Sequence, residues 1–101
     1  MGRPLRVSVG GYAYHCLNRG NGRSTIFRKE GDYEAFERIL AETQQQVPVM
    51  RLLAYCLMPN HWHLVLWPRR GGELSDFLHW LTLTHTQRWR AHYHNVGGGH
   101  L

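Results

Sequence analysis

The amino-acid sequence predicts an α+β fold, in which one antiparallel sheet carries two helices on one face. Residues 61–67 (HWHLVLW) form an alternating apolar run that is typical of a buried strand. Residues 33–40 and 74–81 instead have apolar side chains at helical spacing. The expected order of elements is β-β-α-β-β-α, and packing both helices on one side of the sheet gives a two-layer sandwich.

The first half of the chain is expected to hold two strands and one helix. Residues 12–18 (YAYHCLN) alternate well enough for a first strand. A turn at residues 19–23 (RGNGR) then leads into a short second strand at Ser24–Arg28. Asp32 is expected to cap a helix that runs to about Gln46. One apolar stripe on that helix is formed by Tyr33, Phe36, Ile39 and Leu40.

The second half is expected to hold a hairpin and a long helix. The nearly continuous apolar run Val49–Leu57 predicts a central strand that is buried on both faces. Residues 58–60 (MPN) leave room only for a hairpin-like return, so this strand should pair antiparallel with the strand that follows. A second helix is expected from Glu73 or Ser75 to about His92. Its apolar stripe is formed by Leu74, Phe77, Leu78 and Leu81.

Length and composition predict one folded domain spanning residues 1–101. A chain of 101 residues with 43% hydrophobic residues can build one modest core. It contains no apolar run of membrane-spanning length and no signal-peptide core at its start, so we expect a cytoplasmic protein. Cys16 and Cys56 both fall in predicted strands, where buried, reduced thiols are expected.

The basic residues are unevenly distributed along the chain. The net charge is +5, and residues 1–29 contain basic residues but no acidic one. The acids are confined to residues 30–42 and to Glu73 and Asp76. Such segregation favours binding of phosphate backbones, which release counterions on contact. A solubilising surface without a partner is the alternative explanation, and Arg88 and Arg90 on the second helix fit either one.

His61 and His63 are the candidate metal ligands. On a strand, residues i and i+2 point to the same face, so the two imidazoles project together while Trp62 points to the core. Their Cα atoms should lie about 6.5 Å apart, which allows both rings to converge on one cation. A second such pair, His92 and His94, falls at a helix end, where no period of two aims the rings together.

At these residues the chain resembles a known family. Residues 55–64 (YCLMPNHWHL) resemble the single-tyrosine transposases among the HUH nucleases, and in particular the REP-associated tyrosine transposases. Residues 14–21 (YHCLNRGN) resemble that family's first strand and turn. Residues 26–36 resemble the entry into its first helix, and residues 81–89 the helix after the histidine strand. The resemblance implies a ferredoxin-like fold with the histidine strand in the middle of the sheet.

The resemblance also implies chemistry on single-stranded or hairpin DNA. His61 and His63 would hold a divalent cation, Mg²⁺ or Mn²⁺, which polarises the scissile phosphate. A tyrosine would attack that phosphate and form a reversible 5′-phosphotyrosine link. Contacts to DNA are expected from Asn18, Arg19, Asn21, Arg23, Arg69 and Arg70. Such a protein would be bacterial and nucleoid-associated, and the family includes obligate dimers, so a homodimer is one assembly to consider.

The chain departs from the family pattern at its C-terminal end. Residues 99–101 (GHL) resemble the start of the segment after which the family carries its tyrosine. The nucleophile and a third metal ligand are therefore expected beyond Leu101, and no catalytic residue is assigned within the chain. Tyr93 is the one stand-in by position, but catalytic positioning is strict to within about an angstrom, so we expect slow cleavage or none.

Two other functions fit part of the pattern. A non-catalytic module that binds hairpin DNA or RNA would need the fold and the basic surface but no nucleophile. A metal-dependent phosphohydrolase of the histidine-triad type would need a third alternating histidine, and that position holds Val65. Covalent trapping of a labelled DNA strand on the protein separates the transposase from the binding module.

Overall fold

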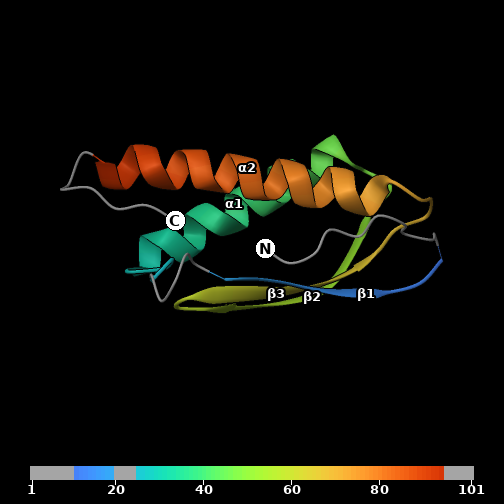
Figure 1. Ribbon diagram of the computed structural model, residues 1–101, viewed down its shortest axis with the longest axis horizontal. Helices are drawn as coiled ribbons and strands as arrows, with labels where there is room; N and C mark the ends of the chain where they lie inside the picture. The colour runs from blue at the N-terminus through green and yellow to red at the C-terminus, as the bar shows by residue number, and fades with distance from the viewer. Residues whose placement is uncertain (1–10, 20–24, 95–101) are drawn as a thin grey trace.

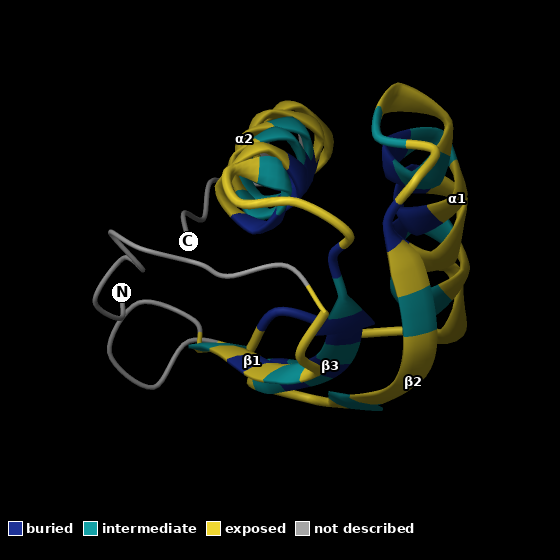
Figure 2. Ribbon diagram, turned by 90° about the vertical axis from the view of Figure 1, so that its right-hand side faces the viewer, coloured by how far each residue is buried: buried dark blue, intermediate teal, exposed yellow. Residues whose placement is uncertain are grey.

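The computed structural model describes residues 11–19 and 25–94, which form a three-stranded sheet with two helices on one side (Figure 1). In chain order the elements are β1 (Tyr14–Arg19), α1 (Glu30–Gln46), β2 (Arg51–Met58), β3 (His61–Trp67) and α2 (Glu73–His94). Figure 2 shows both helices above the same face of the sheet. The predicted α+β class is confirmed, as are the two helices on one face.

The sheet has the order β1-β3-β2, and β3 pairs antiparallel with both neighbours. Strands β1 and β2 are therefore parallel to each other, with β3 inserted between them. Parallel strands need a long crossover, which α1 provides, and the result is the split β-α-β arrangement of ferredoxin-like folds. The histidine strand is the middle strand, as the family resemblance implied.

The strand expected at Ser24–Arg28 does not form within the described residues. Ser24 lies outside them, and residues 25–28 are not part of the sheet. Ile26 and Phe27 are both buried, and their backbone N–H groups both donate to the carbonyl of Pro59, at 2.7 and 3.0 Å. Successive strand residues point to opposite faces, so two adjacent inward side chains suit a docked loop better. The observed order is therefore β-α-β-β-α.

The prediction of a central, doubly buried strand at Val49–Leu57 was wrong. Strand β2 is an edge strand, and most of its residues are exposed, including Leu53 at 51% and Tyr55 at 44%. A register irregularity between Leu52 and Ala54 interrupts its alternation. Its apolar composition did predict a strand, but composition does not tell whether one or two neighbouring strands pair with it.

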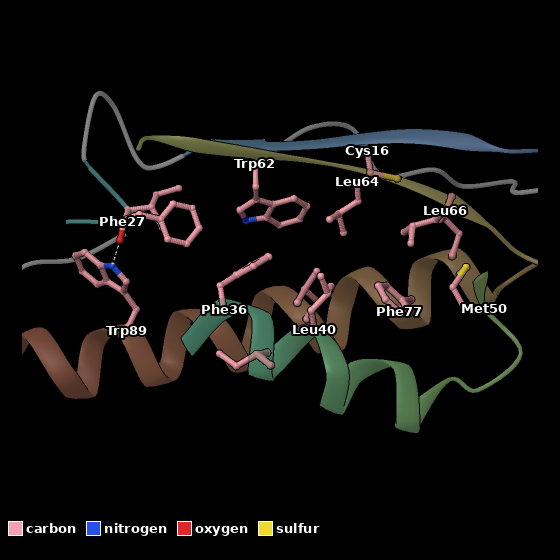
Figure 3. Packing of buried hydrophobic residues seen from close by; sticks show 14 of the residues in the cluster. Cys16, Phe27, Phe36, Leu40, Met50, Trp62, Leu64, Leu66, Phe77 and Trp89 are labelled. Carbon is pink, nitrogen blue, oxygen red and sulfur yellow. Dashed lines mark hydrogen bonds between the residues drawn. The ribbon is translucent and has the colours of Figure 1, made fainter. Parts of the chain in front are cut away.

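The core lies between β3 and the inner faces of the two helices (Figure 3). Trp62, Leu64 and Leu66 of β3 are at most 1% exposed and point towards the helices. Both helical stripes meet them, as predicted. The most deeply buried members of these stripes are Phe36, Ile39, Leu40, Leu74, Phe77 and Leu81.

The N-terminus of α1 differs in detail from the prediction. The N-cap is Lys29, without a side-chain cap, rather than Asp32. Asp32 lies one turn in, and its carboxylate reaches back to accept a hydrogen bond of 2.8 Å from the backbone N–H of Arg28. This bond satisfies a donor just before the first turn, where a negative charge is also favourable. Helix α2 begins at Glu73, one of its two predicted starts.

The two cysteines lie on opposite faces of the sheet. Cys16 is buried, as predicted, and burial raises the pKa of its thiol to about 11. Cys56 is exposed, contrary to the prediction, because the edge strand β2 turns it away from the helices. Both are free thiols.

Candidate metal and nucleic-acid site

His61 and His63, the histidine pair, lie on the face of the sheet opposite the helices. The burial of β3 alternates strictly, with Trp62, Leu64 and Leu66 inside and the histidines half-buried on the other side. We call that other side the open face, because no described helix covers it (Figure 2). The predicted orientation of His61, Trp62 and His63 is thus confirmed, and it follows from the period of two.

The two rings of the histidine pair are close to each other. Their centroids are 4.9 Å apart, and the ring planes are nearly perpendicular at 82°. Each ring has one nitrogen in contact with a neighbour. Nδ1 of His61 lies 2.7 Å from Oδ1 of Asn60, and Nδ1 of His63 lies 2.9 Å from Nε2 of His15. Asn60 directly precedes His61 in the chain, so this contact joins two adjacent residues.

His15 is the residue of the site that sequence reasoning missed. It lies on β1, and its ring is nearly parallel to that of His63, with centroids 5.0 Å apart and an interplanar angle of 8°. The antiparallel register places Leu17 opposite His63 and His15 opposite Val65, so His15 reaches His63 along the diagonal. The sequence alone does not predict this contact, because His15 and His63 are 48 residues apart and nothing local specifies the register of their strands.

The remaining neighbours of the histidine pair come from both flanking strands. On β1, Arg19 pairs with His61 and is exposed. On β2, Cys56 pairs with His63 and Met58 pairs with His61. The pair therefore lies in the middle of the sheet at the end where β1 stops and β2 turns into β3.

The environment favours the neutral form of His63. Its pKa lies below the ordinary value, because partial burial penalises the charged ring and because His61, His15 and Arg19 add positive charge nearby. A neutral imidazole is the form that can donate a lone pair to a cation. The electrostatics and the geometry of the pair are thus compatible with metal binding.

The two histidines do not complete a metal site by themselves. Among the described residues, no group of three histidine, cysteine or acidic side chains is arranged to hold a metal ion. Imidazole suits transition metals, whereas Mg²⁺ and Mn²⁺ prefer oxygen ligands. Two imidazoles therefore fit Mg²⁺ or Mn²⁺ only if oxygen atoms from water or a DNA phosphate fill the other positions.

The predicted DNA contacts are only partly brought together. Asn18 is on the same side of β1 as Cys16, towards the helices, whereas Arg19 is on the open face next to His61. Asn21 and Arg23 lie outside the described residues, with the rest of the turn expected at residues 20–23. The structure therefore supports Arg19 as a neighbour of the histidine pair and separates Asn18 from it.

Arg69 and Arg70 lie at the other end of β3. Both are exposed, and they follow the C-terminal end of a strand whose N-terminal residue is His61. A strand of 7 residues spans about 20 Å, so these arginines are remote from the histidine pair. The backbone N–H of Arg69 donates to the Glu73 carboxylate at 2.8 Å, which ties this loop to the start of α2.

Tyr93 belongs to a separate cluster on the helix side of the sheet. It is 4% exposed, and its hydroxyl donates to the Asp32 carboxylate and accepts from Lys29 at 3.2 Å. The Arg28 guanidinium lies 4.3 Å from its ring centroid. Burial and the bond to Asp32 raise the pKa of Tyr93. This hydroxyl is thus engaged, and it lies on the far side of the sheet from His61 and His63.

A groove of about 300 Å³ between α1 and α2 includes this cluster. Basic side chains are part of its lining, and two of them, Lys29 and Arg88, are paired with acids. Lys29 contacts Asp32 at 3.7 Å, and Arg88 makes two hydrogen bonds to Glu42, at 2.8 and 3.0 Å. Arg88, for which a DNA contact was one explanation, is thus an ion-pair partner that bridges the two helices. His92 contacts Lys29, and the side chain of His94 lies outside the described part.

None of the helices in the described residues is long and apolar enough to cross a lipid bilayer. No curated protein and no solved structure was found to match the chain. A family model described as "Transposase IS200 like" does match, and the match covers residues 8–101. It includes the histidine pair, both helices and all three strands. The chain therefore belongs to the family of IS200-like transposases.

Proposed function

We propose that the chain acts on single-stranded or hairpin DNA and that His61 and His63 hold a divalent cation, Mg²⁺ or Mn²⁺, for strand cleavage and rejoining. Membership of a transposase family implies DNA as the partner. The observation that carries the finer proposal is the geometry of the histidine pair. Both rings lie on the open face, and within the described residues neither Nε2 atom makes a hydrogen bond.

The described residues supply binding and orientation in this proposal. A divalent cation bound at the pair would supply a Lewis acid for the scissile phosphate. His61 and His63 would hold this cation in a fixed position, because they project from a central strand that is paired on both sides. Arg19 is exposed and directly across from His61, which supports the proposal that it contacts a phosphate oxygen of the bound DNA strand.

The proposed reaction also needs a tyrosine hydroxyl as its nucleophile. In the proposed step, a tyrosine oxygen bonds to phosphorus, the bond to the 3′ oxygen breaks, and that oxygen takes up a proton. The hydroxyl of Tyr93 is held by Asp32 and Lys29 on the helix side, and that of Tyr55 donates to Glu37 at 2.8 Å. We therefore assign the nucleophile to neither of them.

A homodimer and an action at the bacterial nucleoid are further parts of the proposal. Strand β2 is an edge strand with exposed Leu53 and Tyr55, and unpaired strand edges can pair with a second copy. Sedimentation of the wild type and of a Leu53→Lys variant tests this: a dimer that the lysine leaves intact would contradict the assignment to β2.

The main test uses a labelled DNA hairpin with a single-stranded flank, in the presence of Mn²⁺. Wild type is compared with the double variant His61→Ala, His63→Ala and with His79→Ala, which removes an exposed histidine from α2. We expect wild type and His79→Ala to bind in a Mn²⁺-dependent manner and the double variant to lose that dependence. A denaturing gel then shows whether labelled DNA is attached to the protein.

The outcomes separate the proposed steps. An adduct that the double variant loses supports metal-assisted cleavage. An adduct that disappears in Tyr93→Phe would contradict our placement of the nucleophile. DNA binding that depends neither on Mn²⁺ nor on the two histidines would contradict the metal site.

That last outcome is what the second candidate function predicts. A non-catalytic module for hairpin DNA or RNA needs only the fold and the basic charge of +5. The observation that favours it is the engagement of the Tyr93 hydroxyl away from the histidine pair. Comparing hairpin DNA with a hairpin RNA of the same sequence would then identify its partner.

A further inference from the structure

The histidine pair has the same asymmetry in both of its rings. In each ring Nδ1 contacts a neighbouring side chain, Asn60 for His61 and His15 for His63. In each ring Nε2 has no hydrogen-bond partner among the described residues. A neutral imidazole has one N–H and one lone pair, so the neighbour at Nδ1 decides which nitrogen can bind a cation.

We propose that Asn60 and His15 are positioning residues that keep a proton on Nδ1 of His61 and His63, so that both Nε2 lone pairs face the open side of the sheet. This inference rests on the proposed metal site and adds the residues that orient it. It concerns the side chains next to the ligands, in the way that partners of ligating histidines fix the ring and its tautomer in other metal sites.

For His61 the chemistry of the contact determines the tautomer. The Oδ1 atom of Asn60 can only accept a hydrogen bond, so Nδ1 of His61 must donate at 2.7 Å. In a neutral ring the lone pair then resides on Nε2. Asn60 immediately precedes β3 in the turn after β2, so this contact is made between adjacent residues.

For His63 the contact with His15 allows two proton positions. If His63 donates through Nδ1, its Nε2 carries the lone pair, and His15 accepts through Nε2. If His15 donates instead, the proton of His63 moves to Nε2 and the ligand is lost. A cation on Nε2 of His63 strengthens Nδ1–H as a donor, so metal binding and the first arrangement reinforce each other.

The nearly parallel orientation of the His15 and His63 rings makes the contact directional, because a ring N–H lies in the plane of its ring. The two rings are nearly parallel, at 8°, and are carried by paired strands in the same sheet. Neither ring can turn far about its χ2 axis without breaking the bond. Two separate segments, the β2–β3 turn and β1, thus orient the two ligands of one site.

The first experiment determines the tautomers directly in metal-free protein, by ¹⁵N–¹H correlation NMR of the imidazole nitrogens. In the wild type we expect a protonated Nδ1 and an unprotonated Nε2 for both His61 and His63. The variant His15→Phe keeps an aromatic ring but removes the acceptor, so His63 should become a tautomer mixture. The variant His15→Gln offers an amide oxygen and should restore the Nδ1–H form. For His61, Asn60→Leu removes the acceptor and Asn60→Asp keeps one, so only Asn60→Leu should produce a tautomer mixture.

The second experiment measures Mn²⁺ affinity of the same variants in the absence of DNA. Loss of a side chain that orients a ligand typically lowers metal affinity about 10-fold or more, which is the effect we expect for His15→Phe and Asn60→Leu. His15→Gln and Asn60→Asp should remain close to the wild type. His79→Phe makes the same change at an exposed histidine of α2 and should have no effect.

The results distinguish this inference from the proposed function. A wild type that binds no Mn²⁺ overturns the metal site and the inference built on it. Wild-type binding that His15→Phe leaves unchanged, or a protonated Nε2 on His63, overturns the role of His15 while the metal site stands. Equal loss in His15→Phe and His15→Gln also overturns a positioning role, because it would make His15 itself a ligand.

Discussion

The two faces of the sheet differ in what their residues do. On the covered face, Trp62, Leu64 and Leu66 pack against the helices and contribute to stability. On the open face, the alternate residues of the same strand, His61 and His63, make polar contacts to side chains from other segments. One strand thus carries the core on one side and the candidate site on the other. A rigid strand holds ligands more closely in place than a loop does.

The largest effect should come from truncating the covered side. Phe77 is fully buried between the sheet and the helices, and Phe77→Ala should lower the free energy of unfolding by about 3–5 kcal/mol. Leu17→Ala, on the open face at 42% exposure, should cost only about 0.5 kcal/mol. Urea unfolding followed by circular dichroism gives both values. Similar losses for the two variants would contradict the contrast between the faces.

A histidine on the helix side should make stability depend on pH. His85 is 6% exposed, packs against Phe27 and Phe36, and burial lowers its pKa from 6.5 to about 4, partly opposed by the charge of Asp32. Between these two values the unfolded chain binds the proton and the folded chain does not. The contribution of His85 is therefore complete above pH 6.5 and is lost as pH falls towards 4, a change of about 3 kcal/mol.

Urea unfolding at pH 7 and pH 4.5 tests this expectation. In His85→Phe, the ring stays apolar and the drop in stability between these pH values should become much smaller. His79→Phe is the matched control, because His79 is exposed on the same helix and its replacement should leave the drop unchanged. An unaltered drop in His85→Phe would show that another group is responsible.

The smallest effect should come from the exposed thiol. Cys56 should react with a maleimide in the native state with little change in stability, because its side chain projects into solvent. Cys16 should react only after unfolding, because it is buried and its pKa is raised to about 11. Mass spectrometry of Cys16→Ser and Cys56→Ser, with and without urea, assigns each adduct. Native labelling of Cys16 would show that the covered face opens readily.

The covered face could largely be predicted from the sequence. Helical spacing identified the stripes of α1 and α2, and alternation in β3 identified which residues point inwards. These patterns are local, because a helix or strand has to bury one side. Two predictions on this side of the molecule were wrong. Ile26 and Phe27 lie in a docked loop rather than a strand, and the apolar run of β2 lies at an edge of the sheet. Both depend on which segments pair, and a local pattern does not contain that information.

The candidate site could likewise be predicted from the sequence only where it depends on local patterns. The orientation of His61 and His63 followed from a period of two within seven residues, and their neighbour Asn60 was adjacent in the sequence. The contact of His15 depends on the register of β1 against β3, and the separation of Arg19 from Arg69 depends on where the strand ends. Residue types therefore identified candidates, whereas only the fold showed which of them are neighbours.

The register of β1 against β3 also has a consequence for folding kinetics. The Asn60–His61 contact is local and can form as soon as the β2–β3 hairpin does, on the fast timescale of hairpin formation. The His15–His63 contact joins residues 48 apart, so it requires closure of a chain segment that includes all of α1. In the proposed metal site, His61 should thus be oriented early and His63 only when β1 docks. During refolding, the recovery of tight Mn²⁺ binding would then report the arrival of β1 rather than the formation of the hairpin.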